Sequence, residues 1–261
     1  EPASMIASES QCRFDSALIA SDGHEVSFWQ FAPHERPDFF DDYLRLKYQI
    51  FVRELDWRGL ALDRIKAGYA AADPFDFDAQ FVIARRRPEG SVGVARGSSY
   101  RRGAFPHEIL FARHLDQPAV QPFRERLGTI NGVGVLPVAR GVYVQPSSLS
   151  GKVTIAQYLI TRIARRLEKD GVRAILITTS AKGRARSFFE RLGWFTIDEA
   201  VFLEGAPCGL VNLVLVLSDV QHLRQRASPL CGICGKSADG PEQTLIEYFH
   251  SAHRAITSKT T

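Results

Sequence analysis

Two carboxylates and one guanidinium are spaced so that together they could hold a zwitterionic ligand. Asp73 and Asp76 lie three residues apart, and Arg96 follows the β-prone segment Val92-Gly93-Val94-Ala95. The carboxylates can accept hydrogen bonds from an ammonium group, whereas the planar guanidinium can bind a carboxylate or orient the two acids. A structural alternative stays open, in which Asp73 caps a short helix and Arg96 forms a surface ion pair.

A glycine-containing turn before a helix is a second candidate site. It reads V-Q-P-S-S-L-S-G-K over residues 144–152. Backbone N–H groups in such a turn, with the positive end of the following helix, can bind an anion such as a pyrophosphate. An ordinary strand-to-helix turn explains the same residues. Basic side chains follow at Arg162, Arg165, Arg166, Lys169 and Arg173. They could attract an acidic protein or phosphate groups, or simply form a solvated helix face.

A set of cysteines and histidines near the C-terminus is a third candidate. Cys231 and Cys234 form a CxxC pair, and His250 and His253 lie three residues apart on a helix predicted over residues 244–255. Residues i and i+3 share a helix face, so the four side chains could bind one tetrahedral zinc. Such a zinc would be structural, because its four positions are filled by the protein. The alternative is two free thiols and an exposed amphipathic helix.

Hydrophobic periodicity predicts the elements that must position these residues. The β-prone segments alternate with helical ones, and the crossover around residues 152–169 indicates a mixed α/β sheet covered by helices. Strands are predicted over residues 24–31, 80–86, 91–98, 129–144, 174–178, 194–203 and 211–217, and helices over 38–55, 152–169 and 184–192.

The composition excludes several protein classes. With 261 residues, 45% hydrophobic and 24% charged, the chain is globular rather than disordered, collagenous or coiled-coil. No apolar run reaches the roughly 18 residues that a membrane-spanning helix needs. Four cysteines do not suffice for a disulfide scaffold, and we expect a reducing, cytoplasmic location. The net charge of +4 suits an acidic partner but makes nucleic acid an improbable one.

Length and pattern suggest one domain with appendages. We expect an N-terminal segment over residues 1–22, in which residues 1–4 before Met5 are a vector-derived addition. The main domain is expected over residues 23–220, and the zinc-binding tail over residues 226–258.

Two motifs resemble the GCN5-related N-acyltransferase superfamily. Val144, Pro146 and Gly151 match its acyl-carrier loop, although the later glycines of that loop are missing. The helix ending in Leu192-Gly193-Trp194 is similar to the superfamily motif in which a helix leads directly into the next strand. Many members have a tyrosine that protonates the leaving thiolate where this chain has Phe188-Phe189. The resemblance implies the superfamily fold.

A more specific layout resembles acyl-homoserine-lactone synthases and the related N-acyl amino acid synthases. Lys47, Phe51 and Trp57 stand at the spacing of a family Arg, Phe and Trp, and are followed by the Asp-x-x-Asp pair and the strand arginine. The lactone synthases carry Glu-x-x-Arg on the fourth strand, where this chain reads N-G-V-G over residues 131–134. The lost polar groups favour an acceptor other than S-adenosylmethionine.

The resemblance implies an N-acyltransferase that moves a fatty acyl group from acyl carrier protein or acyl-CoA to the amine of an amino acid. One alternative is an acyl-homoserine-lactone (quorum-sensing) synthase that uses S-adenosylmethionine. An alternative of another class is a non-catalytic, zinc-containing module that binds nucleic acid or protein. The implied catalytic residues are Asp73, Asp76 and Arg96 with a backbone N–H near Val135 or Val142, the substrate-binding residues are Lys47, Phe51, Trp57 and Thr179, and the residues for the acyl carrier or pantetheine are Ser150, Gly151, Lys152, Arg162 and Arg166.

Overall fold

The computed structural model describes residues 17–57, 59–100, 108–149, 151–181, 184–198, 206–232 and 240–258. Residues 1–4, which we expect to be an addition, lie outside the described residues. The chain divides into two compact units. The first contains Glu1–Gly97 and Gly132–Ile163, and the second contains Ser98–Asn131 and Ala164–Thr261.

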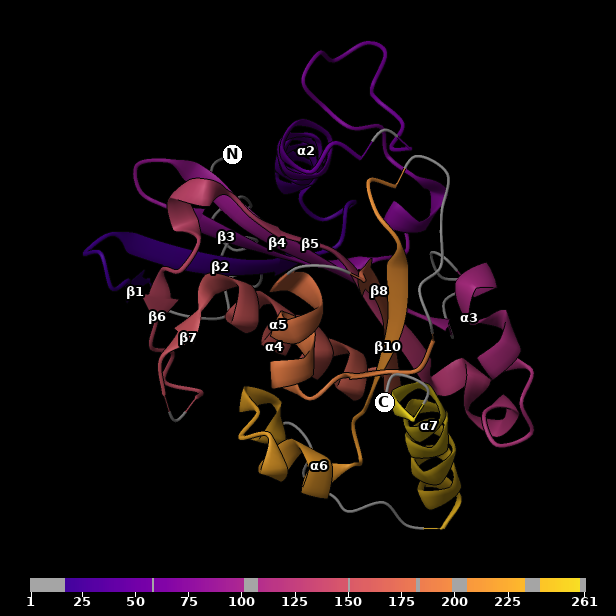
Figure 1. Cartoon of the computed structure of the whole chain (residues 1–261). Coiled ribbons are helices and arrows are strands. Elements are labelled where there is room, and N and C mark those ends of the chain that lie inside the picture. Colours follow the sequence, from indigo (N-terminus) through magenta and orange to yellow (C-terminus); the bar gives the residue numbers. More distant parts are fainter. Residues whose placement is uncertain are drawn as a thin grey trace. The chain divides into compact units, whose positions relative to one another are not determined.

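The first unit is built on antiparallel strands in the order β1-β2-β3-β4 (Figure 1). The strands are β1 (Leu18–Ile19), β2 (Glu25–Phe31), β3 (Gln80–Arg86) and β4 (Gly90–Ser99). The strands predicted over residues 24–31, 80–86 and 91–98 are confirmed as β2, β3 and β4. The register pairs Phe81 with Arg96, which fixes the face of the sheet on which the Arg96 side chain lies.

Two helices cover opposite faces of these strands. Helix α2 (Pro37–Lys47) starts with proline at its first position, where the missing N–H costs nothing. Its Phe39 and Tyr43 pack with Phe31 and Phe81. Helix α4 (Ile155–Lys169) contacts the other face, where the Tyr158 ring lies 4.6 Å from the ring of Phe28. Since side chains alternate along a strand, Phe28 and Phe31 of β2 point to opposite sides.

The predicted helix over residues 38–55 is confirmed in extent but not in type. After Lys47 it continues as a π-helix, η1 (Tyr48–Glu54). Short π-helical turns are rare and occur often at functional sites. The long connection that follows contains the 3₁₀ turn η2 (Pro74–Asp76).

The predicted strand over residues 129–144 divides into several elements. Strand β5 (Leu127–Val135) ends before Pro137, and the 3₁₀ turn η5 (Pro137–Ala139) follows. A small hairpin of β6 (Tyr143–Val144) and β7 (Val153–Thr154) then precedes α4. Helix α4 therefore begins three residues later than predicted, because Val153 and Thr154 pair with β6 instead.

The second unit contains strands in the order β5-β8-β10-β9. Strand β8 (Ala174–Ser180) is parallel to β5 and antiparallel to β10 (Leu210–Val216), which pairs with β9 (Phe195–Thr196). The parallel pairing covers only Leu127–Thr129 of β5 and Ala174–Leu176 of β8, although β8 continues to Ser180. Strands β4 and β5 have residues in both units. The predicted mixed sheet with covering helices is confirmed, as is helix α5 (Arg184–Leu192).

The C-terminal helix is part of the core of the second unit. Helix α7 (Pro241–Thr257) buries Leu245, Ile246 and Phe249 and contacts β9 and β10 (Figure 1). Apolar packing therefore fixes its position, whereas the sequence suggested a tail that is ordered by metal. Three further helical elements that the sequence did not indicate are α3 (Glu108–Leu115), α6 (Val220–Gln225) and the 3₁₀ turn η4 (Gln121–Arg126).

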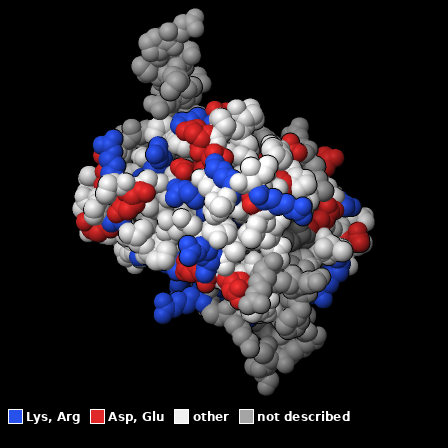
Figure 2. Space-filling model, turned by 90° about the horizontal axis from the view of Figure 1, so that it is seen from above, with Lys and Arg blue, Asp and Glu red and all other residues white. Residues whose placement is uncertain are grey.

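The surface carries both signs of charge. Figure 2 shows one face, on which Lys and Arg side chains alternate with Asp and Glu side chains. Among the described residues, no helix combines the length and the hydrophobicity needed to cross a membrane.

Candidate active site

Four charged side chains form a buried cluster in the first unit. The Asp73 carboxylate accepts hydrogen bonds from Lys47 Nζ at 3.1 Å and from an Arg96 guanidinium nitrogen at 2.8 Å. Asp76 also pairs with Arg96, and lies 3.5 Å from Lys47 Nζ. The structure thus brings together the two acids and the arginine predicted from the sequence, and adds Lys47 as a direct partner.

Each element positions one part of this cluster for a local reason. Asp73 caps η2, because its Oδ1 accepts from the Phe75 N–H at 3.0 Å and Asp76 Oδ2 accepts from the Asp73 N–H at 2.8 Å. Lys47 lies on the last turn of α2. Arg96 shares a strand face with Val94, which packs in the core under α2. The predicted helix cap is confirmed, but Arg96 is only 5% exposed, so the surface ion pair is wrong.

The two acids differ in access to solvent. The Asp76 side chain is fully buried, whereas the Asp73 side chain is 34% exposed. Burial by itself raises the pKa of Asp73, but the positive charges of Arg96 and Lys47 outweigh it, and its pKa lies below the ordinary value. Asp73 is therefore an accessible carboxylate that stays ionised, and Asp76 is an internal group that holds the cluster together.

Tyr43 is a member of the site that the sequence analysis did not single out. Its hydroxyl donates to Asp76 Oδ1 at 2.9 Å. Burial is the main cause that raises the pKa of Tyr43 well above its ordinary value, so the hydroxyl keeps its proton. Tyr43 precedes Lys47 by one helical turn, and that spacing is the signal that could have revealed it.

Two aromatic side chains lie between Lys47 and Asp73 along the chain. The rings of Phe51 and Trp57 meet edge to face with centroids 6.1 Å apart. The backbone N–H of Trp57 donates to the backbone carbonyl of Phe51 at 2.8 Å. Both are partly exposed. They therefore offer apolar surface within and just after the π-helix, and their role in substrate binding stays a prediction.

The glycines of β5 lie against the same cluster. Gly132 has a φ of +59°, and a Cβ there would lie 3.7 Å from Arg96 Cβ and from the Tyr43 ring. A Cβ on Gly134 would approach Ile50 Cδ1 to 2.7 Å, which is shorter than any ordinary contact. Local packing therefore leaves no room for a side chain at Gly134 unless Ile50 moves.

The predicted carbonyl-polarising N–H groups lie in different settings. Val135 is the last residue of β5, and its carbonyl accepts from Arg140 Nε at 3.0 Å. Val142 lies between η5 and β6 rather than on the strand, and its N–H donates to the Ala139 carbonyl at 3.4 Å. That N–H is already used within a turn, whereas the role predicted for the Val135 N–H stays a prediction.

The anion-binding turn is less open than the sequence suggested. Ser150 lies outside the described residues, while Gly151 and Lys152 are exposed in the β6–β7 hairpin. Thr154 Oγ1 accepts from the Gln157 N–H at 3.2 Å, and the Ile155 N–H donates to the Val142 carbonyl at 3.2 Å. Two amides at the start of α4 are thus already paired.

The other residues assigned to the donor or substrate lie on α4 and β8. The Arg162 guanidinium lies 6.0 Å from the Tyr158 ring centroid, and Arg166 Nε lies 3.5 Å from Asp170. Thr179, near the end of β8, is paired with Val211 of β10. It lies beyond the part of β8 that pairs with β5, where the two strands have separated.

The two histidines of the proposed zinc set contact other groups in the structure. His250 Nε2 lies 2.6 Å from Asp219 Oδ2, and His253 Nδ1 lies 2.8 Å from the Thr196 carbonyl. Cys231 is a free thiol, and Cys234 lies outside the described residues. Each histidine thus has a protein partner, and the four-ligand site stays a prediction.

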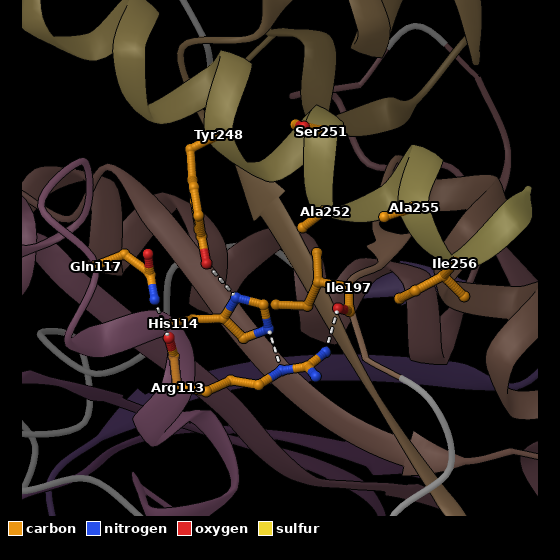
Figure 3. A pocket seen from close by; sticks show the side chains of 9 residues that line it. All are labelled: Arg113, His114, Gln117, Ile197, Tyr248, Ser251, Ala252, Ala255 and Ile256. Atoms are coloured by element: carbon orange, nitrogen blue, oxygen red, sulfur yellow. Dashed lines mark hydrogen bonds between the residues drawn. The ribbon is translucent and has the colours of Figure 1, made fainter.

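The second unit contains a cavity that the sequence did not indicate. It has a volume of about 440 Å³ and is formed by residues of α3, α7 and Ile197 (Figure 3). His114 is its central polar group, because its Nδ1 lies 2.7 Å from the Tyr248 hydroxyl and its Nε2 lies 3.1 Å from Asp198. Arg113 also pairs with Asp198 and donates to the Ile197 carbonyl at 3.1 Å. Burial, assisted by the Arg113 charge, lowers the pKa of His114 to about 4.

We expect this histidine to make stability depend on pH. Its folded-state pKa of about 4 lies below the ordinary 6.5, so between these values only the unfolded chain binds the proton. The free energy of unfolding should therefore fall as pH is lowered from 6.5 to 4, by roughly 3 kcal/mol at about 1.4 kcal/mol per pKa unit. Denaturant unfolding at several pH values gives the dependence of the unfolding free energy on pH. This dependence should be weaker in His114→Gln than in the wild type, and unchanged in His34→Gln. Equal slopes in the wild type and in His114→Gln would contradict the assignment.

Comparisons with known proteins identify the fold. No protein-family model matches the chain, and no curated protein sequence matches it. Among solved structures, the CoA-dependent acyl-homoserine lactone synthase MesI aligns with a TM-score of 0.52 and 19% identity, over 82% of this chain and 100% of MesI. FeeM, an N-acyl amino acid synthase from uncultured soil microbes, aligns with a TM-score of 0.54 and 15% identity, over 80% and 97%. TofI, in a complex with an inhibitor and MTA, aligns with a TM-score of 0.54 and 18% identity, over 78% and 99%. The resemblance noted in the sequence is therefore confirmed at the level of fold, and the chain has the fold of acyl-homoserine lactone synthases and N-acyl amino acid synthases.

Proposed function

We propose that the chain is an N-acyltransferase that moves a fatty acyl group from a thioester, carried by acyl carrier protein or coenzyme A, to the amine of an amino acid. The observation that carries this proposal is the buried cluster of Lys47, Asp73, Asp76 and Arg96, in which only Asp73 reaches solvent appreciably. An ionised carboxylate held by two buried cations suits an ammonium group, and the cluster occurs in the fold of enzymes whose names describe acyl transfer to amines.

The reaction follows from these groups. Asp73 holds the acceptor ammonium, which loses one proton to solvent water, and the resulting free amine attacks the thioester carbonyl. The C–N bond forms, the C–S bond breaks, and the thiol departs. Because Arg96 and Lys47 hold the pKa of Asp73 low, this carboxylate is better suited to binding and orienting the ammonium than to removing its proton. Proximity supplies much of the acceleration.

Helix α5 carries Phe188 and Phe189 where many members of the superfamily have a tyrosine. The rings of these two residues meet edge to face at 5.4 Å, and Phe189 also contacts Trp194 at 5.6 Å. They thus pack with the core of the second unit. A thiol has an unperturbed pKa of about 8.5, so it can depart as the thiolate without an acid at this position.

Asn131 and Gly134, which stand where the lactone synthases of the resemblance have Glu and Arg, favour an amino acid over S-adenosylmethionine as the acceptor. The lactone-synthase resemblance places an arginine at Gly134, but the contact with Ile50 excludes a side chain there in the present packing. This site therefore lacks the polar groups that the sequence comparison associates with S-adenosylmethionine. The second candidate, an acyl-homoserine-lactone synthase, is favoured by the fold match to MesI and TofI.

For the acyl donor we propose only a chemical class, an acyl thioester. MesI is described as CoA-dependent, and this chain could take either thioester. The paired amides at the start of α4 leave fewer groups for a pyrophosphate than the sequence suggested. A carrier protein would instead need basic surface, and Figure 2 shows mixed charges on the face drawn.

Thiol release tests the proposal. Purified protein should release free thiol from long-chain acyl-CoA or acyl carrier protein when amino acids are supplied, and mass spectrometry should detect the N-acyl amino acid. Parallel reactions with S-adenosylmethionine should give no acyl-homoserine lactone. Detection of the lactone alone would replace the amino acid by S-adenosylmethionine as acceptor. Absence of acceptor-dependent thiol release from both donors would contradict acyl transfer, and steep salt-dependent binding to nucleic acid would then favour the non-catalytic alternative.

A further inference from the structure

Three potential metal ligands gather in the second unit. They are Asp219, which caps α6, His222, one turn later on α6, and His250 on α7. One ligand atom from each lies within 4.8 Å of the others. The closest pair is His250 Nε2 and Asp219 Oδ2, at 2.6 Å. Segments about 30 residues apart in sequence thus place two imidazoles and one carboxylate together.

The hydrogen bond of His222 fixes which of its nitrogens is available. Its Nε2 lies 3.1 Å from the Gly193 carbonyl, and because a carbonyl oxygen only accepts, this nitrogen carries the proton. Nδ1 then keeps its lone pair. Histidines that bind metals commonly donate their other N–H to a backbone carbonyl, which fixes the tautomer and the ring orientation.

The surroundings supply an opening and an unsatisfied polar group. Asp219 and His250 line a cavity of about 300 Å³ together with Ser218. The Ser218 side chain is 9% exposed, and its hydroxyl has no hydrogen-bond partner among the described residues. A buried hydroxyl without a partner indicates a missing water or ligand. Behind the histidines, the Phe195 ring stacks on His250 at 4.7 Å and gives the cluster an apolar wall.

We propose that Asp219, His222 and His250 bind one divalent transition-metal ion, and that zinc is the ion expected. Two imidazoles and a carboxylate suit zinc better than magnesium or calcium, which prefer oxygen ligands throughout. Three protein ligands leave a fourth position for water, to which the Ser218 hydroxyl can form a hydrogen bond. The metal replaces the His250–Asp219 hydrogen bond and links α6 to α7. This set shares only His250 with the Cys231, Cys234, His250 and His253 set that the sequence suggested.

Metal titration of the full chain tests the site. After treatment with a chelator, the protein should bind about one zinc per chain in calorimetry, and its melting temperature should rise on adding zinc. His222→Gln and His250→Gln should each weaken zinc binding by about 100-fold or more, since even outer-shell changes cost 10- to 100-fold. The matched controls His253→Gln and Cys234→Ser should bind zinc like the wild type.

Cobalt gives a second readout that needs no variant. Cobalt bound by nitrogen and oxygen ligands should show visible absorption without the intense near-ultraviolet band of thiolate ligands. A thiolate band, or loss of binding in Cys234→Ser with binding kept in His222→Gln, would overturn the proposal in favour of the Cys/His set. If chelator-treated wild type binds neither metal, the three residues form only a hydrogen-bonded network, and the proposal is wrong. Thiol release measured on the same samples reports acyl transfer separately.

Discussion

Replacing Arg96 with alanine is expected to destabilise the chain by about 3–5 kcal/mol and to reduce acyl transfer more than tenfold. The substitution leaves the fully buried Asp76 carboxylate with Lys47 as its remaining cationic partner at 3.5 Å. Removing one partner of a buried ion pair is costly because the remaining charge stays buried. Denaturant unfolding and thiol release with a long-chain acyl donor would measure the two effects, and turnover should be compared only at denaturant-free conditions where the variant is folded.

Two further variants separate charge from geometry at this position. Arg96→Lys keeps the charge but replaces the guanidinium, one terminal nitrogen of which contacts both acids, with a compact ammonium group, so we expect an intermediate loss. Arg87→Ala is the matched control, because the Arg87 side chain is 83% exposed and lies 3.6 Å from Glu25 in a surface pair of small energetic value. Wild-type stability and turnover in Arg96→Ala would contradict the site.

Asp73→Asn is expected to reduce acyl transfer about 100-fold at low acceptor concentration. Asparagine still caps η2, since Asp and Asn are nearly equivalent at this position. The substitution removes the accessible negative charge that we propose to hold the acceptor ammonium. The expected signature is a raised KM for the amino acid with a smaller change in kcat, measured by thiol release over a range of acceptor concentrations.

The control carboxylate is Asp63, which also accepts hydrogen bonds from backbone N–H groups but lies outside the cluster. Its Oδ1 accepts from Ile65 and Lys66 at 2.8 and 2.9 Å. Asp63→Asn should leave the KM for the acceptor unchanged. Because the pKa of Asp73 lies below the ordinary 3.8, protonation of this carboxylate should not limit activity above about pH 4. An unchanged acceptor KM in Asp73→Asn would show that the ammonium binds elsewhere.

The sequence by itself determined much of the secondary structure. The β-prone runs over residues 80–86 and 91–98 predicted strands β3 and β4, and the apolar stripe that includes Tyr43 predicted the long N-terminal helix. These patterns are local, so periodicity reports them directly. The short spacing of Asp73 and Asp76 likewise indicated a helix cap with two adjacent carboxylates, which η2 confirms.

Only the tertiary structure decided which charged groups share a site. Arg96 reaches the acids because register and strand alternation place it under α2, and Tyr43 joins them through a hydrogen bond to a residue 33 positions away. The contact of Gly134 with Ile50 is similarly long-range. The sequence showed that helix α7 is amphipathic. It did not show that β9 and β10 form the surface on which this helix packs. The sequence therefore grouped His250 with the nearby cysteines and a neighbouring histidine. In the structure, packing brings His250 to Asp219 and His222 instead. The reason is that distances between side chains depend on how the elements pack and not on their spacing along the chain.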